Sequence, residues 1–249
     1  MPIKGILFDK DGTLVDFDAT WFAIGDLMAL EAAAGDRTRA DALLADAGYD
    51  FEARRFRGDS VFAAGTNADI VALWYPHLDA LQRADMVMRF DTFTAEAGAA
   101  KCVPLPGAVD ALGLLHASGL RLGVATNDST NGAEKTVASL GVAQLFDAVY
   151  GYDAVANPKP AADTIVAFSD LTGLKPSEIA MVGDNRHDLE MARAGGAGLA
   201  VGVLSGTGKR EALAPLADII LGSITELPAF LAHYEPSRLD RAHRDRTTA

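Results

Sequence analysis

The sequence predicts an α/β fold in which helices cover both faces of a parallel, doubly wound sheet, with an all-helical segment inserted after the first strand. Two observations support this prediction. Short apolar runs alternate with helical segments over residues 103–232, which is typical of a parallel sheet. Residues 18–98 instead carry alanine, leucine and charged residues at helical spacing. A chain of 249 residues is long enough to form both parts.

The first strand is predicted at residues 3–8, a continuous apolar run that ends at Asp9. Strands buried on both faces lack polar alternation, so this run fits the interior of a parallel sheet. Asp11 and Gly12 follow with turn chemistry. In the inserted segment, the apolar spacing predicts about four helices and no strand. These helices are expected at residues 21–30, 40–47, 70–74 and 81–93.

The rest of the chain is predicted to alternate between helices and strands. Helices are expected at residues 108–117, 132–140, 161–171, 189–194 and 226–232. Strands are expected at residues 121–125, 148–150, 179–182, 199–203 and 218–221. The predicted domains are therefore an α/β core of residues 1–17 and 99–235 and a helical cap of residues 18–98. Residues 236–249 are poor in apolar side chains, which predicts a disordered tail.

The balance of charges excludes several classes of partner. Asp and Glu number 34 against 22 Lys and Arg, which gives a formal net charge of −12. This negative field repels polyanions, so neither nucleic acid nor an anionic membrane is an expected partner. Cys102 is the single cysteine and the five histidines are dispersed, which argues against disulfides and zinc. No signal peptide or membrane span is evident, so we expect a cytoplasmic protein.

Polar motifs stand at several strand ends and in one loop of the predicted core. Ligands of open parallel sheets bind beyond the carboxyl ends of the strands, so we expect these motifs to converge on one edge of the sheet. The motifs are Asp9-Lys10-Asp11-Gly12-Thr13, Thr126-Asn127, Lys159 between two prolines, and Gly183-Asp184 followed by Asp188.

This ordered set, DxDGT, TN, a lone lysine and GDxxxD, resembles the haloacid dehalogenase superfamily. Within it, the chain is most similar to the phosphoglycolate-phosphatase-like branch, whose helical cap lies between the first two motifs. The match covers residues 3–17 and 103–227, and the insert matches only in length and helical character. The resemblance implies a Rossmann-like core. It also implies that Asp11 offers its backbone carbonyl to a metal and that Asp188 orients the metal shell.

The residue types fit phosphoryl transfer. A carboxylate such as Asp9 can attack a phosphoryl group and form an aspartyl-phosphate, which divides hydrolysis into two steps. Asp11 emerges from the same strand end, so it can protonate the leaving alkoxide and later deprotonate the attacking water. A carboxylate that attacks a phosphate dianion meets repulsion, and Mg²⁺ would offset it with an oxygen-only ligand set. Asp9 and Asp184 are the expected carboxylate ligands.

Other residues of the motifs are expected to hold the phosphate. Lys159 supplies a fixed positive charge, and Thr126 and Asn127 would bind phosphate oxygens in line. We expect Gly12 and Thr13 to bind substrate as well, since glycine permits a backbone conformation that brings amides close to phosphate.

Related reactions differ in what they require. A dehalogenase has no use for Asp11 or magnesium, and a phosphonatase places a Schiff-base lysine in the cap, where residues 18–98 contain none. A phosphomutase of the β-phosphoglucomutase type shares all the motifs and stays an alternative; dependence on a bisphosphate activator would reveal it. A non-catalytic phosphate-sensing module is a remote alternative, because such a protein would naturally lack Asp9 or Asp11.

We therefore expect a Mg²⁺-dependent phosphatase of a small phosphorylated metabolite, with 2-phosphoglycolate as the expected substrate and a monomer or homodimer as the assembly. One departure bears on the substrate: Phe17 follows Asp16, where close members of the branch usually have serine. The cap also carries a basic cluster that either meets a substrate anion or forms a solvated helix end. This cluster comprises Arg54, Arg55 and Arg57.

Overall fold

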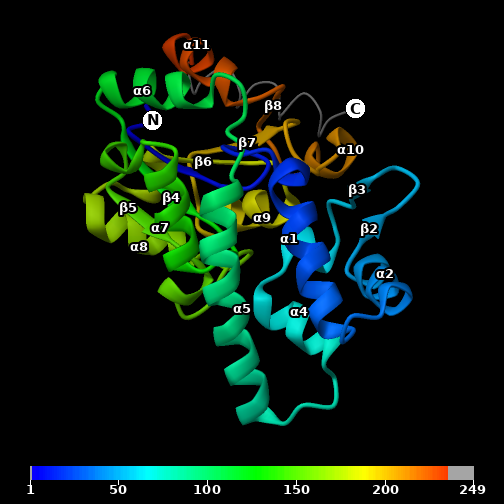
Figure 1. Ribbon diagram of the computed structural model, residues 1–249. Coiled ribbons are helices and arrows are strands. Elements are labelled where there is room, and N and C mark those ends of the chain that lie inside the picture. Colours follow the sequence, from blue (N-terminus) through cyan, green and yellow to red (C-terminus); the bar gives the residue numbers. More distant parts are fainter. Residues whose placement is uncertain (1, 235–249) are drawn as a thin grey trace.

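The computed structural model describes residues 2–234, and its central feature is a six-stranded parallel sheet with the order β5-β4-β1-β6-β7-β8 (Figure 1). The predicted α/β fold is confirmed, and each predicted strand is present to within two residues at either end. The strands are β1 (Gly5–Phe8), β4 (Arg121–Ala125), β5 (Ala148–Tyr150), β6 (Ile179–Gly183), β7 (Leu199–Val203) and β8 (Ile219–Leu221). The predicted tail, residues 236–249, lies outside the described residues.

Helices cover both faces of the sheet, and short helical turns join them to the strands. The α-helices of this part are α6 (Ala108–Ala117), α7 (Thr130–Ser139), α8 (Asp163–Thr172), α9 (Arg186–Ala194), α10 (Arg210–Leu213) and α11 (Leu227–Ala232). The 3₁₀ turns are η1 (Ala143–Leu145), η2 (Tyr152–Ala154), η3 (Pro176–Glu178) and η4 (Ile224–Glu226).

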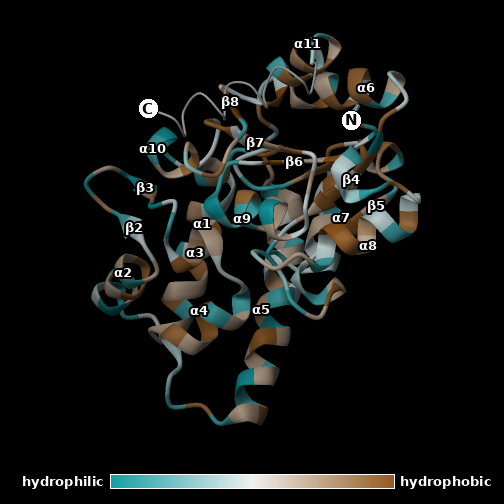
Figure 2. Cartoon of the chain, turned by 180° about the vertical axis from the view of Figure 1, so that it is seen from behind, coloured by the Kyte–Doolittle hydropathy of each residue, from teal (hydrophilic) through white to brown (hydrophobic). Residues whose placement is uncertain are grey.

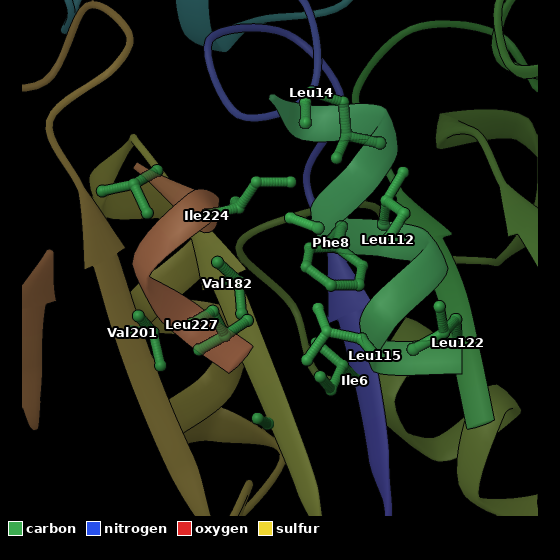
Figure 3. Packing of buried hydrophobic residues seen from close by; sticks show 14 of the residues in the cluster. Ile6, Phe8, Leu14, Leu112, Leu115, Leu122, Val182, Val201, Ile224 and Leu227 are labelled. Atoms are coloured by element: carbon green, nitrogen blue, oxygen red, sulfur yellow. The ribbon is translucent and has the colours of Figure 1, made fainter. Parts of the chain in front are cut away.

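Strand β1 lies in the middle of the sheet and sends its side chains alternately to the two faces. Ile6 and Phe8 face α6, whose Leu112 and Leu115 pack over them, as Figure 3 shows. Leu7 points to the opposite face and joins the cluster of α8 and α9. Because β1 is hydrogen-bonded to β4 and β6 and covered on both faces, the residue that follows it is held at a fixed point of the fold.

The segment between β1 and α6 has a hydrophobic core of its own. Its helices are α1 (Phe17–Ala32), α2 (Arg37–Asp46), α3 (Val61–Ala64), α4 (Asn67–Trp74) and α5 (Ala80–Lys101). Aromatic side chains dominate this core, which is separate from the clusters on the sheet: Trp21, Phe56, Phe62, Trp74 and Phe90. Figure 2 shows apolar residues concentrated on the strands, whereas apolar and polar residues alternate along α5. The exact domain boundaries stay a prediction.

One expectation for this segment was wrong. We predicted no strand in it, but β2 (Tyr49–Asp50) and β3 (Arg55–Phe56) form a short antiparallel pair. Asp50 builds the turn between them by accepting hydrogen bonds from the backbone N–H groups of Glu52 and Ala53. Strands of two residues are too short for apolar alternation to appear in the sequence. Within residues 2–234, no helix is both long and apolar enough to cross a membrane.

Two leucines of α6 test how much the covered face of the sheet contributes to stability. Leu112 is 1% exposed and Leu114 is 61% exposed. We expect Leu112→Ala to lower the free energy of unfolding by about 2–5 kcal/mol, because it leaves a cavity against β1. Leu114→Ala should change it by no more than about 0.5 kcal/mol. Urea unfolding monitored by circular dichroism measures both, and equal effects would contradict this packing.

Candidate active site

The strand ends and the inserted segment enclose one pocket. Asp9 follows β1, Thr126 follows β4, Asp184 follows β6, and Lys159 comes from the loop after β5. The insert closes the pocket with side chains of α1 and of the stretch from α3 to α4: Phe17, Trp21, Phe62, Thr66, Asn67 and Ile70. The structure thus brings together seven residues singled out in the sequence: Asp9, Asp11, Thr126, Asn127, Lys159, Asp184 and Asp188.

Lys159 is a buried cation held between two buried carboxylates. Its Nζ lies 2.6 Å from Asp9 Oδ1 and 2.6 Å from Asp188 Oδ1. Burial opposes its charged form, but the two carboxylates outweigh this and raise the pKa of Lys159 above its ordinary value. The lysine therefore stays protonated and fixes the orientation of the Asp9 carboxylate.

Three buried carboxylates make a set of donors that fits a divalent metal ion. Oxygens of Asp9, Asp184 and Asp188 lie within 4.8 Å of one another. Burial raises the pKa of Asp9 well above its usual value, despite the opposing charge of Lys159, and burial beside Asp188 raises that of Asp184 to about 7. One lysine cannot neutralise three carboxylates, and hard cations prefer such oxygen ligands. The cluster therefore suits a divalent cation.

Hydrogen bonds from the backbone orient two of these carboxylates. Asp184 Oδ2 accepts bonds from the N–H of Thr207 at 2.7 Å and from its hydroxyl at 3.2 Å. Asp188 Oδ2 accepts a bond from the N–H of Asn185 at 2.9 Å, which forms a capping box at the start of α9. Thr207 was not predicted to act at the site, although its glycine-rich surroundings in the sequence indicate a tight loop.

Gly12 and Thr13 do not line the pocket. Gly12 has φ +80°, and a Cβ built there would lie 2.7 Å from Asp184 Cγ. Glycine is therefore needed at this position to make room for the Asp184 carboxylate. The hydroxyl of Thr13 is buried and has no hydrogen-bond partner among residues 2–234. Binding of substrate by these two residues stays a prediction.

The side chains of Thr126 and Asn127 make different kinds of hydrogen bond. The hydroxyl oxygen of Thr126 accepts a bond from the N–H of Asp128 at 3.1 Å, which leaves its hydrogen free to donate into the pocket. The Asn127 amide instead donates to the carbonyl of Ala64 in the insert at 2.8 Å and to that of Lys159 at 3.3 Å. In this structure Asn127 therefore links the core to the insert.

Two further core residues make similar links, and sequence analysis missed both of them. The Asn185 amide donates to the carbonyl of Gly58, and His187 Nδ1 lies 3.2 Å from the carbonyl of Ala64. Both residues lie inside the GDxxxD motif, and their spacing gives no sign of contact with the insert. The basic cluster of the insert is exposed and does not line the pocket: Arg54, Arg55 and Arg57.

Asp11 is bonded at both of its carboxylate oxygens. Trp21 Nε1 donates to Asp11 Oδ1 at 2.6 Å, and Lys10 Nζ lies 2.6 Å from Asp11 Oδ2. The Lys10 ammonium also lies 3.2 Å from Asp128 Oδ2 and 5.1 Å from the centre of the Trp21 ring. Sequence analysis gave Trp21, Lys10 and Asp128 no role at the site. The one visible sign of such a role was a lysine between two aspartates.

Comparisons with known proteins agree on one family. A family model described as haloacid dehalogenase-like hydrolase matches residues 3–196. The phosphoglycolate phosphatase of Salmonella typhimurium (strain LT2) is 32% identical over 239 residues, which cover 90% of this chain and 91% of the relative. That of Escherichia coli (strain K12) is 31% identical over 249 residues, covering 94% and 95%.

A solved structure shows the same fold. The crystal structure of a predicted phosphoglycolate phosphatase from Haemophilus somnus 129pt has a TM-score of 0.69 against this chain. The match is 20% identical in sequence and covers 92% of this chain and 97% of that one. At this identity the likeness concerns the fold alone.

The acidic cluster predicts that the metal-free protein loses stability as the pH rises from about 4 to about 7. The raised pKa of Asp184 lets the folded state keep a proton that the unfolded chain releases in this range, so deprotonation favours unfolding. Thermal unfolding of chelator-treated protein tests this. The melting temperature of the wild type should fall by roughly 5 °C relative to Asp184→Asn across the range. Parallel pH curves for the two proteins would contradict the prediction.

Proposed function

We propose, from the premise that this chain belongs to the haloacid dehalogenase-like hydrolase family and is a phosphatase, that it hydrolyses a small phosphate monoester through an aspartyl-phosphate on Asp9. One observation carries the proposal. Two carboxylates from one strand end, Asp9 and Asp11, share a pocket with the buried Lys159 and with an acidic cluster that suits a divalent cation.

The proposed reaction has two steps. In the first, a carboxylate oxygen of Asp9 attacks phosphorus, and the P–O bond to the alcohol breaks while Asp11 gives that oxygen a proton. In the second, Asp11 takes a proton from water, whose oxygen attacks phosphorus and releases Asp9 and inorganic phosphate. Lys159 offsets charge on the phosphoryl oxygens and holds Asp9 in place, and the Thr126 hydroxyl is free to bind a phosphate oxygen.

We propose Mg²⁺ as the metal, held by the carboxylates of Asp9 and Asp184 and by the backbone carbonyl of Asp11, with Asp188 orienting the site. These residues offer only oxygen donors, which is the set that magnesium prefers. When bound, the ion supplies positive charge that stabilises the transferring phosphoryl group.

The proposed substrate is small, and 2-phosphoglycolate is the first candidate. The relatives that match nearly the whole chain are named phosphoglycolate phosphatases. The closed pocket leaves a cavity of about 60 Å³. Beyond the phosphate, the leaving group would meet Phe62 and Ile70, together with the polar side chains of Thr66 and Asn67.

Removal of the nucleophile tests the mechanism. We expect Asp9→Asn to lower kcat by at least about a thousandfold, because the amide cannot form the phosphoenzyme. The melting temperature should not fall, since the substitution removes a buried charge and leaves an oxygen for Lys159 to bond. Asp36→Asn is the matched control: Asp36 caps α2 away from the pocket, asparagine also caps helices, and activity should stay within about twofold. Full activity of Asp9→Asn would refute the mechanism.

A panel of phosphate esters with and without Mg²⁺ tests the substrate. The panel holds 2-phosphoglycolate, sugar phosphates, a nucleotide monophosphate, and a hexose 1-phosphate with its bisphosphate. We expect magnesium-dependent phosphate release, fastest from 2-phosphoglycolate. Isomerised hexose phosphate that forms only with bisphosphate would identify a phosphomutase instead. Release that is equally fast after chelation would count against the metal.

A further inference from the structure

The proposed reaction requires that Asp11 meet the leaving oxygen, but it does not explain why both carboxylate oxygens of Asp11 are already bonded. The Trp21 indole occupies Oδ1 and the Lys10 ammonium occupies Oδ2, each at 2.6 Å. Both groups can only donate hydrogen bonds. Two fixed donors on opposite oxygens define the rotation of a carboxylate about its Cβ–Cγ bond, which one donor alone would leave free.

Lys10 is an unusual residue to find here, because its side chain is 1% exposed and does not line the pocket. Burial of an ammonium group is costly unless carboxylates pair with it. Asp11 and Asp128 supply that pairing, and the face of the Trp21 ring adds a cation–π contact. If Lys10 only filled space in the core, an apolar side chain could do so at a lower cost in free energy.

The two donors come from different parts of the fold. Lys10 lies in the loop after β1, and its second partner, Asp128, lies in the loop after β4. Trp21 lies on α1 and packs in the aromatic core of the insert. The orientation of Asp11 therefore depends on both the core and the insert.

We propose that Trp21 and Lys10 are positioning residues that clamp the Asp11 carboxylate, so that proton transfer to the leaving group is efficient only when the insert lies against the core. This proposal rests on the proposed function, because it assigns Asp11 the proton transfer. The dependence on the insert comes from Trp21, which is part of the insert and donates to Asp11. In the same arrangement, the insert carbonyls of Ala64 and Gly58 accept bonds from the core residues Asn127 and Asn185.

The dependence on the leaving group separates positioning of Asp11 from a merely structural role. An alkyl phosphate needs a proton on its leaving oxygen, whereas acetyl phosphate releases acetate, a stable anion that needs none. The value of kcat/KM reports the steps up to departure of the leaving group. We expect Trp21→Phe, which keeps a ring but removes the N–H donor, to lower kcat/KM about tenfold for the best alkyl phosphate. For acetyl phosphate the loss should be clearly smaller, because its leaving group needs no proton.

Trp74 provides a matched control. It is also a buried tryptophan in the core of the insert, and its indole donates to the carbonyl of Leu43 at 3.0 Å, away from the pocket. Trp74→Phe should change kcat/KM for both substrates by the same factor. An equal effect of Trp21→Phe on the two substrates would overturn the clamp. If the wild type hydrolyses neither ester, that result counts against the proposed function. The indole N–H signal of Trp21 then tests whether Trp21 holds Asp11.

The second measurement does not depend on turnover. The chain has two tryptophans, so a ¹⁵N-labelled sample gives two indole N–H signals, and Trp74→Phe assigns them. A short bond to a carboxylate moves an indole proton downfield. Asp11→Asn should therefore shift the Trp21 signal upfield and leave the Trp74 signal in place. An unmoved Trp21 signal would overturn the proposal.

Lys10 is tested as a charge-balanced pair. Lys10→Met alone strands two carboxylates and can prevent folding, so the informative variant is Lys10→Met with Asp128→Asn, which removes one charge of each sign. We expect it to lower kcat/KM for the alkyl phosphate about tenfold more than for acetyl phosphate. A folded double variant with no preference between the two esters would exclude Lys10 from the clamp.

Discussion

The main physical constraint on the structure is the concentration of negative charge at one edge of the sheet. Carboxylates of Asp9, Asp184 and Asp188 are buried together, and Lys159 compensates for only part of their charge. Repulsion of this kind would drive the loops apart if they were free. Each loop instead starts from the end of a buried strand, and backbone N–H groups fix two of the carboxylates. Packing of the sheet thus supplies the free energy that holds like charges close.

Features of the fold and the site could be predicted where they depend on neighbouring residues in the sequence, and not where they depend on contacts between distant segments. Buried parallel strands are continuous apolar runs, so their positions were visible, and the acidic motifs were visible because they follow those runs. The β2–β3 pair was too short to leave a pattern. The contact between Trp21 and Asp11 depends on how α1 rotates against the sheet, which no spacing encodes. The bond from the Asn127 amide to the carbonyl of Ala64 also depends on how the insert lies against the core, so the sequence did not reveal it.

The pocket lies between two separately packed cores. The sheet carries one apolar cluster on each face, and the insert has an aromatic cluster that joins neither. Some polar links between the two parts lie at the pocket, where amides of Asn127 and Asn185 bond to backbone carbonyls. Others lie along α5, where Asp91 accepts a bond from the Tyr152 hydroxyl and Glu96 pairs with Lys135. Links of this kind break at smaller cost than an apolar interface, since water can replace each hydrogen bond. If the insert separates from the core to admit substrate, these are the bonds that would break.

The central position of β1 in the sheet determines the order in which the parts of the site unfold. Proteins open locally in cooperative units, and strands with two partners and two covered faces open only when the whole domain unfolds. Asp9 extends β1, and its N–H still donates to Val182 of β6 at 2.8 Å. Asp9, the proposed nucleophile, therefore belongs to the unit that opens last. Trp21 belongs to the insert, so a partial opening of the insert would release Asp11 while Asp9 stays in place. Mild denaturant would then remove the acid–base function proposed for Asp11 before it displaced Asp9.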